Sequence, residues 1–371
     1  MKESSQKKPI FFYCFSPDGS DSYQHPIVCL AEGLKALGIE FYSNINYWQI
    51  SADSEEYLFR HDPTIGPDDC SIVVMENNWF IHGKPFPDHL FHAKRKYRTV
   101  YFEHAAASRY SWESQYRQFD FIFRAHYNQR CRYPTNVYPW AFGLSERVID
   151  QTHLLPEFSD RNQTLLVNFR IHNHPLRTLI SRKFFPEIEQ ILPIDQATDS
   201  LDSFPTGSND YLQWVQTGKR HYPSYYERLK HSVACACFGG LLMNSWPPDP
   251  YAYDLKPQRP LWQRAINRTI NSLDPRPPRV LSWESYRFWE SLAAGCVPIH
   301  IDFEKYGICL PVMPENWRHY IGIDIDNIEA AITKIKDEPQ LLETISTKGR
   351  RWALEHYDPK ETARRFLQTV G

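Results

Sequence analysis

The sequence predicts an α/β fold made of two doubly wound domains. At 371 residues the chain is long enough for two domains of ordinary size, each with its own hydrophobic core. Its start has the order strand, polar loop, helix, strand, over residues 9–15, 16–25, 27–37 and 39–42, which is how a doubly wound sheet begins. Later in the chain, residues 282–302 combine an amphipathic helix, a glycine and a short apolar strand.

Polar side chains are expected where the strands of the first domain end. Ligands bind at the carboxyl ends of parallel strands, so Asp18, Asp21 and His25, in and just after the first loop, are candidate acceptor-side residues. Ordinary turn chemistry is the alternative for this loop. A later strand is followed directly by Glu103 and His104, the most base-like pair, although a histidine here also fits a helix cap or loop packing. The further strands are expected at 71–76, 98–102 and 119–124.

The second half of the chain repeats the alternation of strands and helices. Strands are expected at 163–169, 233–237, 297–301 and 320–324, and helices at 176–191, 224–231, 283–294, 328–335 and 339–357. The crossing between the domains is placed around 145–160, after a stretch with little periodicity. Residues 245–278 are dense in proline, tryptophan and arginine, and we interpret them as an insertion that forms a proline-rich flap, a lid, or an acceptor or partner surface.

The helix that precedes Gly295 carries two charges, Arg287 and Glu290, within a run of Trp, Phe, Leu and Ala. Ser282 or Ser285 is a candidate cap at its start, and the glycine ends it. A helix N-terminus attracts phosphate, and an arginine in its first turns adds a two-pronged phosphate contact. A glutamate near the helix centre is placed to accept hydrogen bonds from ribose hydroxyls. The alternative is a surface helix with one salt-bridged face.

Residues 287–299, R-x-W-E-S-L-A-A-G-C-V-P-I, resemble the donor-binding helix and strand of GT-B glycosyltransferases, and most closely those of the exostosin-like branch. Residues 225–235 resemble the strand approach of that branch, and residues 173–179 resemble its arginine-bearing segment. The matches occur in family order over roughly the second half of the chain. In one departure, Ser282 stands where many GT-B enzymes have the first of two spaced glutamates, and Glu284 is out of register. This favours the usually inverting exostosin-like branch.

The resemblance implies a GT-B fold, in which two Rossmann-like domains face a central cleft. We expect an acceptor-side domain over residues 1–150, a nucleotide-sugar-binding domain over 151–355, and a C-terminal helix at 356–371 that crosses back to the first domain. The implied activity is transfer of a sugar from a nucleotide-diphosphate sugar to an acceptor hydroxyl, independent of metal and with inversion. No cofactor is expected beyond the nucleotide-sugar donor.

The resemblance also implies roles for individual residues. Arg177 matches the basic segment that approaches the donor diphosphate, with Arg170 as a second candidate, and a solvated basic face is the alternative. Gly239 lets the backbone approach a ligand closely. The residues expected to bind the donor are Arg170, Arg177, Gly239, Ser282, Arg287 and Glu290. The candidates for the base that takes the acceptor proton are Asp21, Glu103 and His104.

Composition bears on the partners and the compartment. The net charge of -2 gives no case for non-specific nucleic-acid binding, so a glycan, a lipid-linked molecule or a protein is the expected acceptor. No apolar run reaches the ~18 residues of a spanning helix, so we expect a cytoplasmic protein, with peripheral membrane association left open. The eight scattered cysteines predict buried free thiols. Asp324-Ile325-Asp326 imitates a DxD metal motif, but no metal site is expected, because this triplet lies far from the other candidates in the sequence and the resemblance implies transfer without a metal.

Two other functions remain open at this point. The first is a different enzyme on the same architecture, such as a nucleotide-sugar epimerase. The second is a degenerate transferase that serves as a partner- or glycan-binding module through the 245–278 insertion. The serine at position 282, in place of a glutamate, keeps the second alternative open, and fold alone does not decide function.

Overall fold

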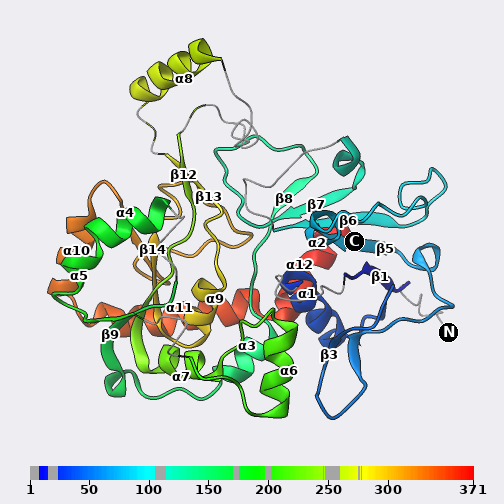
Figure 1. Ribbon diagram of the computed structural model, residues 1–371, viewed down its shortest axis with the longest axis horizontal. Helices are drawn as coiled ribbons and strands as arrows, with labels where there is room; N and C mark the ends of the chain where they lie inside the picture. The colour runs from blue at the N-terminus through cyan, green and yellow to red at the C-terminus, as the bar shows by residue number, and fades with distance from the viewer. Residues whose placement is uncertain are drawn as a thin grey trace, which may run out of the picture.

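The computed structural model contains two parallel β-sheets that lie side by side, with helices packed around them (Figure 1). It describes residues 8–15, 24–104, 114–169, 175–196, 202–244, 246, 260–274, 276 and 278–371. The expected α/β architecture of two Rossmann-like units is therefore confirmed. Three of the candidate residues, Asp18, Asp21 and Arg170, lie outside the described residues.

The first sheet has the strand order β2-β1-β5-β6-β7-β8, and all neighbouring strands are parallel. Its strands are β1 (Ile10–Tyr13), β2 (Phe41–Ser43), β5 (Ile72–Glu76), β6 (Arg98–Glu103), β7 (Phe121–Arg124) and β8 (Val137–Pro139). Strand order reverses at β1 and β5, which is where open α/β sheets bind ligands. The other elements here are α1 (His25–Ala36), the antiparallel pair β3 (Tyr47–Gln49) and β4 (Tyr57–Phe59), α2 (Asn77–Ile81), and 3-10 turns at Pro67–Asp69 and Ser114–Gln118.

The second sheet has the order β10-β9-β11-β14-β15 and is also parallel throughout. Its strands are β9 (Asn162–Val167), β10 (Ile194–Gln196), β11 (Ser232–Ala236), β14 (Val297–Ile301) and β15 (Ile321–Ile323). An antiparallel hairpin of β12 (Leu241–Met243) and β13 (Arg279–Leu281) stands apart from this sheet. The expected strands of both halves are thus present, because buried β-branched and aromatic runs mark them in the sequence.

Helices connect the strands of the second half and continue to the end of the chain. They are α3 (Glu146–Gln151), α4 (Pro175–Lys183), α5 (Phe185–Ile188), α6 (Ser208–Gln216), α7 (Pro223–His231), α8 (Leu261–Leu273), α9 (Tyr286–Ala293), α10 (Ile328–Asp337), α11 (Leu341–Tyr357) and α12 (Pro359–Val370), with a 3-10 turn at Phe158–Asp160. The helix expected at 176–191 is in fact two helices, α4 and α5, that meet at Phe184. The helix α8 inside the insertion was not expected from the sequence.

The chain returns to the first sheet at its end, where α12 packs against α1 (Figure 1). A methyl group at Gly33 of α1 would lie 1.8 Å from the backbone oxygen of Pro359, so only glycine permits this approach. Phe366 and Val370 of α12 are buried in the core on one face of the first sheet. The last helix is thus part of the core of the first half.

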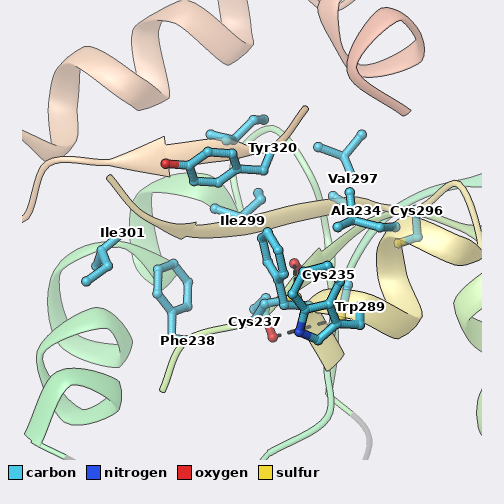
Figure 2. Close-up of a cluster of buried hydrophobic side chains, with 14 of the residues drawn as sticks. Ala234, Cys235, Cys237, Phe238, Trp289, Cys296, Val297, Ile299, Ile301 and Tyr320 are labelled. Atoms are coloured by element: carbon cyan, nitrogen blue, oxygen red, sulfur yellow. Dashed lines mark hydrogen bonds between the residues drawn. The ribbon is translucent and has the colours of Figure 1, made fainter. Parts of the chain in front are cut away.

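Each sheet has its own buried core. In the second half, the core is centred on β11, β14 and α9, and Figure 2 shows Trp289 of α9 and three cysteines among its apolar side chains. Cys235, Cys237 and Cys296 are buried there as free thiols, and all eight cysteines of the chain are unpaired. The expectation of free thiols is therefore confirmed.

Candidate functional site

The start of α9 lies against the carboxyl edge of the first sheet. Ser285 precedes the helix in an extended conformation, and its hydroxyl contacts the backbone oxygen of Cys237 at 3.4 Å instead of capping the helix. The next residue, Tyr286, stacks on Phe142 with ring centroids 4.8 Å apart, and its ring lies 4.9 Å from that of His25. The first turn of α9 therefore has no side-chain cap and sits where the two halves meet.

Two arginines of the second half converge on one aromatic ring near this turn. The guanidinium of Arg177 lies 4.7 Å from the ring centroid of Phe169, and that of Arg287 lies 5.6 Å from it. Arg177 is only 8% exposed and donates to the backbone oxygen of Phe238 over 2.8 Å. Nε of Arg287 is buried and has no hydrogen-bond partner among the described residues. Arg177 and Arg287, two of the residues expected to bind the donor, thus lie beside the same ring.

The two guanidinium groups of this pair carry like charges at close range. Burial, together with the nearby charge of Arg287, lowers the pKa of Arg177 to about 9. Two guanidinium groups held beside one ring repel each other, and a bound anion would offset that repulsion. Phosphate oxygens fit this role because guanidinium groups bind them with paired, charge-assisted hydrogen bonds.

Glu290 is held by two tyrosine hydroxyls. Tyr225 donates to one carboxylate oxygen over 3.2 Å, and Tyr226 donates to the other over 2.9 Å. Arg147 in turn donates to the Tyr226 hydroxyl over 2.6 Å. Each carboxylate oxygen keeps a further lone pair, so the glutamate can still accept hydrogen bonds from a ligand. The two tyrosines lie in the segment that carries the resemblance, but the sequence did not reveal their role.

Gly239 and Ser282 lie close together at the base of the β12–β13 hairpin. A methyl group at Gly239 would lie 2.8 Å from the backbone oxygen of Trp283, so the glycine allows two chain segments to approach each other. Ser282 has a φ of 53°, a conformation that few non-glycine residues adopt. Both residues therefore shape the turn that leads into α9. The described contacts show this backbone role for them.

The predicted base pair has a different arrangement from the one that the sequence suggested. Glu103 is fully buried and forms an ion pair with Arg124 on the neighbouring strand β7. His104 instead contacts Glu76, the last residue of β5, with 2.8 Å between Nε2 and Oε2. The backbone N–H of His104 donates to Asn77 over 2.9 Å. Sequence reasoning missed Glu76, although its position at the end of a strand was a signal for it.

Two other histidines lie at the same edge of the sheet, but burial holds them neutral. His25 is 1% exposed and His126 is 5% exposed. In both cases desolvation, with nearby arginine charge, lowers the pKa of the imidazole to about 3. His104 is less buried than either of them. It is therefore the histidine of the three that is best placed to exchange a proton with a bound molecule.

A second buried carboxyl, Glu284, connects the two halves. Its Oε1 accepts from the backbone N–H of Phe142 over 2.6 Å and from Nε1 of Trp289 over 2.8 Å. Its own backbone N–H donates to Nδ1 of His126 over 3.0 Å. Burial raises the pKa of this carboxyl to about 8. The sequence placed Glu284 out of register with a family motif, and the structure shows that it joins the strand end and the helix start.

Two further properties of the described residues are relevant here. No group of three His, Cys, Asp or Glu side chains among them is arranged to hold a metal ion. None of the described helices combines the length and the hydrophobicity needed to cross a bilayer.

The sequence matches no protein-family model and no curated protein. Solved structures nevertheless share the fold. An alpha-glucosyltransferase (AGT) in complex with UDP is 12% identical with a TM-score of 0.53, over 97% of this chain and 98% of that chain. An alpha-glucosyltransferase in complex with UDP-glucose and DNA containing an abasic site has the same values. A third structure, with UDP and a 13-mer DNA containing a HMU base, is 13% identical with a TM-score of 0.51, over 98% of this chain and 99% of that chain. The chain therefore has the GT-B fold over nearly its whole length.

The pH dependence of stability tests the description of Glu284. Its pKa is about 8 when folded and near the usual 4.5 when unfolded, so the folded protein retains a proton that the unfolded chain loses. Stability from this group is full below about pH 4.5 and falls as the pH rises toward 8, by at most about 1.4 kcal/mol per pH unit. Burial also raises the pKa of Glu32 to about 8, which adds a second contribution of the same sign.

We therefore expect Glu284→Gln to reduce the loss of stability between pH 5 and pH 8, because the amide keeps an oxygen for Phe142 and Trp289 but does not ionise. Urea unfolding across this range measures the slope. Glu32→Gln is the matched comparison and removes the other contribution. A slope that is unchanged in Glu284→Gln would contradict a protonated, buried carboxyl at this position.

Proposed function

We propose that this chain is a glycosyltransferase that transfers a sugar from a nucleoside diphosphate sugar to an acceptor hydroxyl. The observation that carries the proposal is the convergence of Arg177 and Arg287 on Phe169, close to the uncapped start of α9. A diphosphate would neutralise the two guanidinium groups and use the free N–H groups of the helix. The same groups would stabilise the charge that develops on the leaving nucleotide during transfer.

Three further considerations support a nucleotide-sugar as the donor. Glu290 lies one helical turn after Arg287, at the spacing that puts two side chains on one side of a helix. Its carboxylate is oriented by Tyr225 and Tyr226, which suits it to bind the vicinal hydroxyls of a ribose. Solved structures with this fold contain UDP or UDP-glucose. The nucleotide-sugar is the only small molecule that the proposal requires, and no metal has a role in it.

On the acceptor side, we place the base function on His104. With Glu76 as a carboxylate, Nε2–H of His104 donates to it and Nδ1 is left as the basic nitrogen. An inverting transfer needs such a base to take the acceptor proton. Glu103 is given a structural role instead, since it neutralises the buried charge of Arg124. Inversion and membership of the exostosin-like branch are part of the proposal and rest on the pattern at residues 287–299.

The acceptor is proposed to be the hydroxyl of a glycan, a lipid-linked molecule or a protein. The net charge of -2 does not favour general attraction to a nucleic acid. Two of the solved structures contain DNA according to their titles, so an acceptor panel should include DNA beside the other classes.

Replacing Arg287 with alanine should weaken binding of a nucleoside diphosphate. Loss of a charge-assisted contact to phosphate costs about 2 kcal/mol, which is a decrease of ~30-fold in affinity. Thermal-shift titrations with UDP, GDP and their sugars measure the change. Arg318→Ala is the matched control, because Arg318 is 54% exposed and pairs only with Glu315 among the described residues. Equal affinity in both variants would contradict the assignment of Arg287 to the diphosphate.

Replacing His104 with glutamine should lower kcat by ~10²- to 10⁴-fold and leave donor affinity unchanged, because the base acts on the acceptor side. Sugar transfer to the acceptor found in the panel gives kcat, and NMR of the product gives the configuration at the anomeric carbon. His92→Gln, at a more exposed histidine beside Asp68, is the control. Full activity of His104→Gln, or a product with retained configuration, would remove the base role from this residue.

A further inference from the structure

Helix α8 projects from the body of the protein on the hairpin of β12 and β13 (Figure 1). The two strands of the hairpin are paired along their length, Leu241 with Leu281 and Met243 with Arg279. Arg279 is fully buried and donates to the backbone oxygen of Asn244 over 3.1 and 2.9 Å. The hairpin and α8 together form an arm, and the base of this arm is the turn that leads into α9. The helix is therefore held away from the two cores but connected to the candidate site.

One side of α8 is an apolar stripe that faces away from the protein. Trp262 is 65% exposed, Ile266 is 49% exposed and Leu273 is 78% exposed. Ile266 is four residues after Trp262, and Leu273 is seven residues after Ile266. The three positions therefore lie within about 40° of one another around the helix axis. Ile270 lies at the edge of the same stripe and is half-buried. A surface helix of a globular protein ordinarily turns such a stripe toward the core.

The opposite side of the helix is the one attached to the protein. Asn271 is nine positions after Trp262, which places it about 180° around the helix. Its side chain donates to the backbone oxygen of Trp246 over 3.0 Å and accepts from the backbone N–H of Trp246 over 2.9 Å. These two hydrogen bonds fix the rotation of α8. The outward direction of the stripe follows from them.

The charge of α8 indicates which kind of surface would bind this stripe. The sequence of the helix, LWQRAINRTINSL, contains two arginines and no acidic residue. Arg268 is exposed. An apolar stripe with tryptophan near one end and the exposed Arg268 on another side is the pattern of a helix that lies in the interface of an anionic bilayer. Its projection from the body lets a flat surface reach the whole stripe.

We propose that α8 binds this protein to the surface of a membrane that contains anionic phospholipid. Trp262, Ile266 and Leu273 enter the boundary between headgroups and acyl chains, and Arg268 remains at the level of the phosphates. Because the arm begins at the turn before α9, membrane binding holds the candidate site near the bilayer. The proposal does not depend on the glycosyltransferase function, since it concerns binding alone.

Flotation of the full chain with vesicles tests the proposal. We expect the protein to float with vesicles of phosphatidylcholine and phosphatidylglycerol, and to float much less with phosphatidylcholine alone. The triple variant Trp262→Ser, Ile266→Ser, Leu273→Ser should lose binding by at least about tenfold, because the apolar contact is gone. Arg268→Glu should weaken binding to the anionic vesicles, most strongly at low salt. Leu154→Ser, at a residue 70% exposed on another surface, is the matched control and should bind normally.

Three results would overturn the proposal. The first is a wild-type protein that does not float with either kind of vesicle. The second is a triple variant that floats as well as the wild type. The third is a wild-type protein that light scattering shows to be a dimer, and a triple variant that is a monomer, because a second copy would then cover the stripe. The unfolding temperature of each variant is measured as a control. A value equal to that of the wild type shows that the substitutions left the fold intact.

Discussion

The contact between the start of α9 and the carboxyl edge of the first sheet holds the candidate site together. Tyr286 packs against the cores of both halves, on Phe142 and beside His25. Glu284, two residues earlier, accepts a hydrogen bond from the backbone of Phe142. With the strand ends and the helix start joined in this way, the neighbouring Arg287 and the pair of His104 and Glu76 belong to one region of the molecule.

The donor side combines two positive charges held close together. The guanidinium groups of Arg177 and Arg287 share the Phe169 ring, and Nε of Arg287 is buried without a hydrogen-bond partner among the described residues. A multivalent anion bound between the two guanidinium groups would attract both and offset their mutual repulsion. On the acceptor side Glu103 pairs with Arg124, and Glu76 contacts the imidazole of His104.

The sequence predicted the features that depend on local pattern. Buried runs of β-branched and aromatic residues gave the strands, and Gly295, with a φ of 58°, ends α9 as expected. The resemblance brought Arg177 and Arg287 into one proposed site before any distance was known. The fold class followed from the same alternation of strands and helices.

Features that depend on pairing across the sheet or on the direction of a side chain were not predictable in this way. The partner of His104 is Glu76, 28 residues earlier, and only the register of two parallel strands brings them together. The tyrosines that orient Glu290 lie more than 60 residues before it. Helix α8 was missed because the proline-rich sequence around it obscures the helical spacing of its apolar residues. In addition, its apolar side faces outward instead of packing against a core.

The central claim is that the arginine pair recognises a diphosphate. Isothermal titration of the wild-type protein with a nucleoside, its monophosphate and its diphosphate, for uracil and for guanine, tests it most directly. The account predicts that for one base the diphosphate binds at least about tenfold more tightly than the monophosphate, with no measurable binding of the nucleoside, because phosphate contacts supply most of the affinity. Equal affinity along the series, or no binding of any diphosphate, would contradict it.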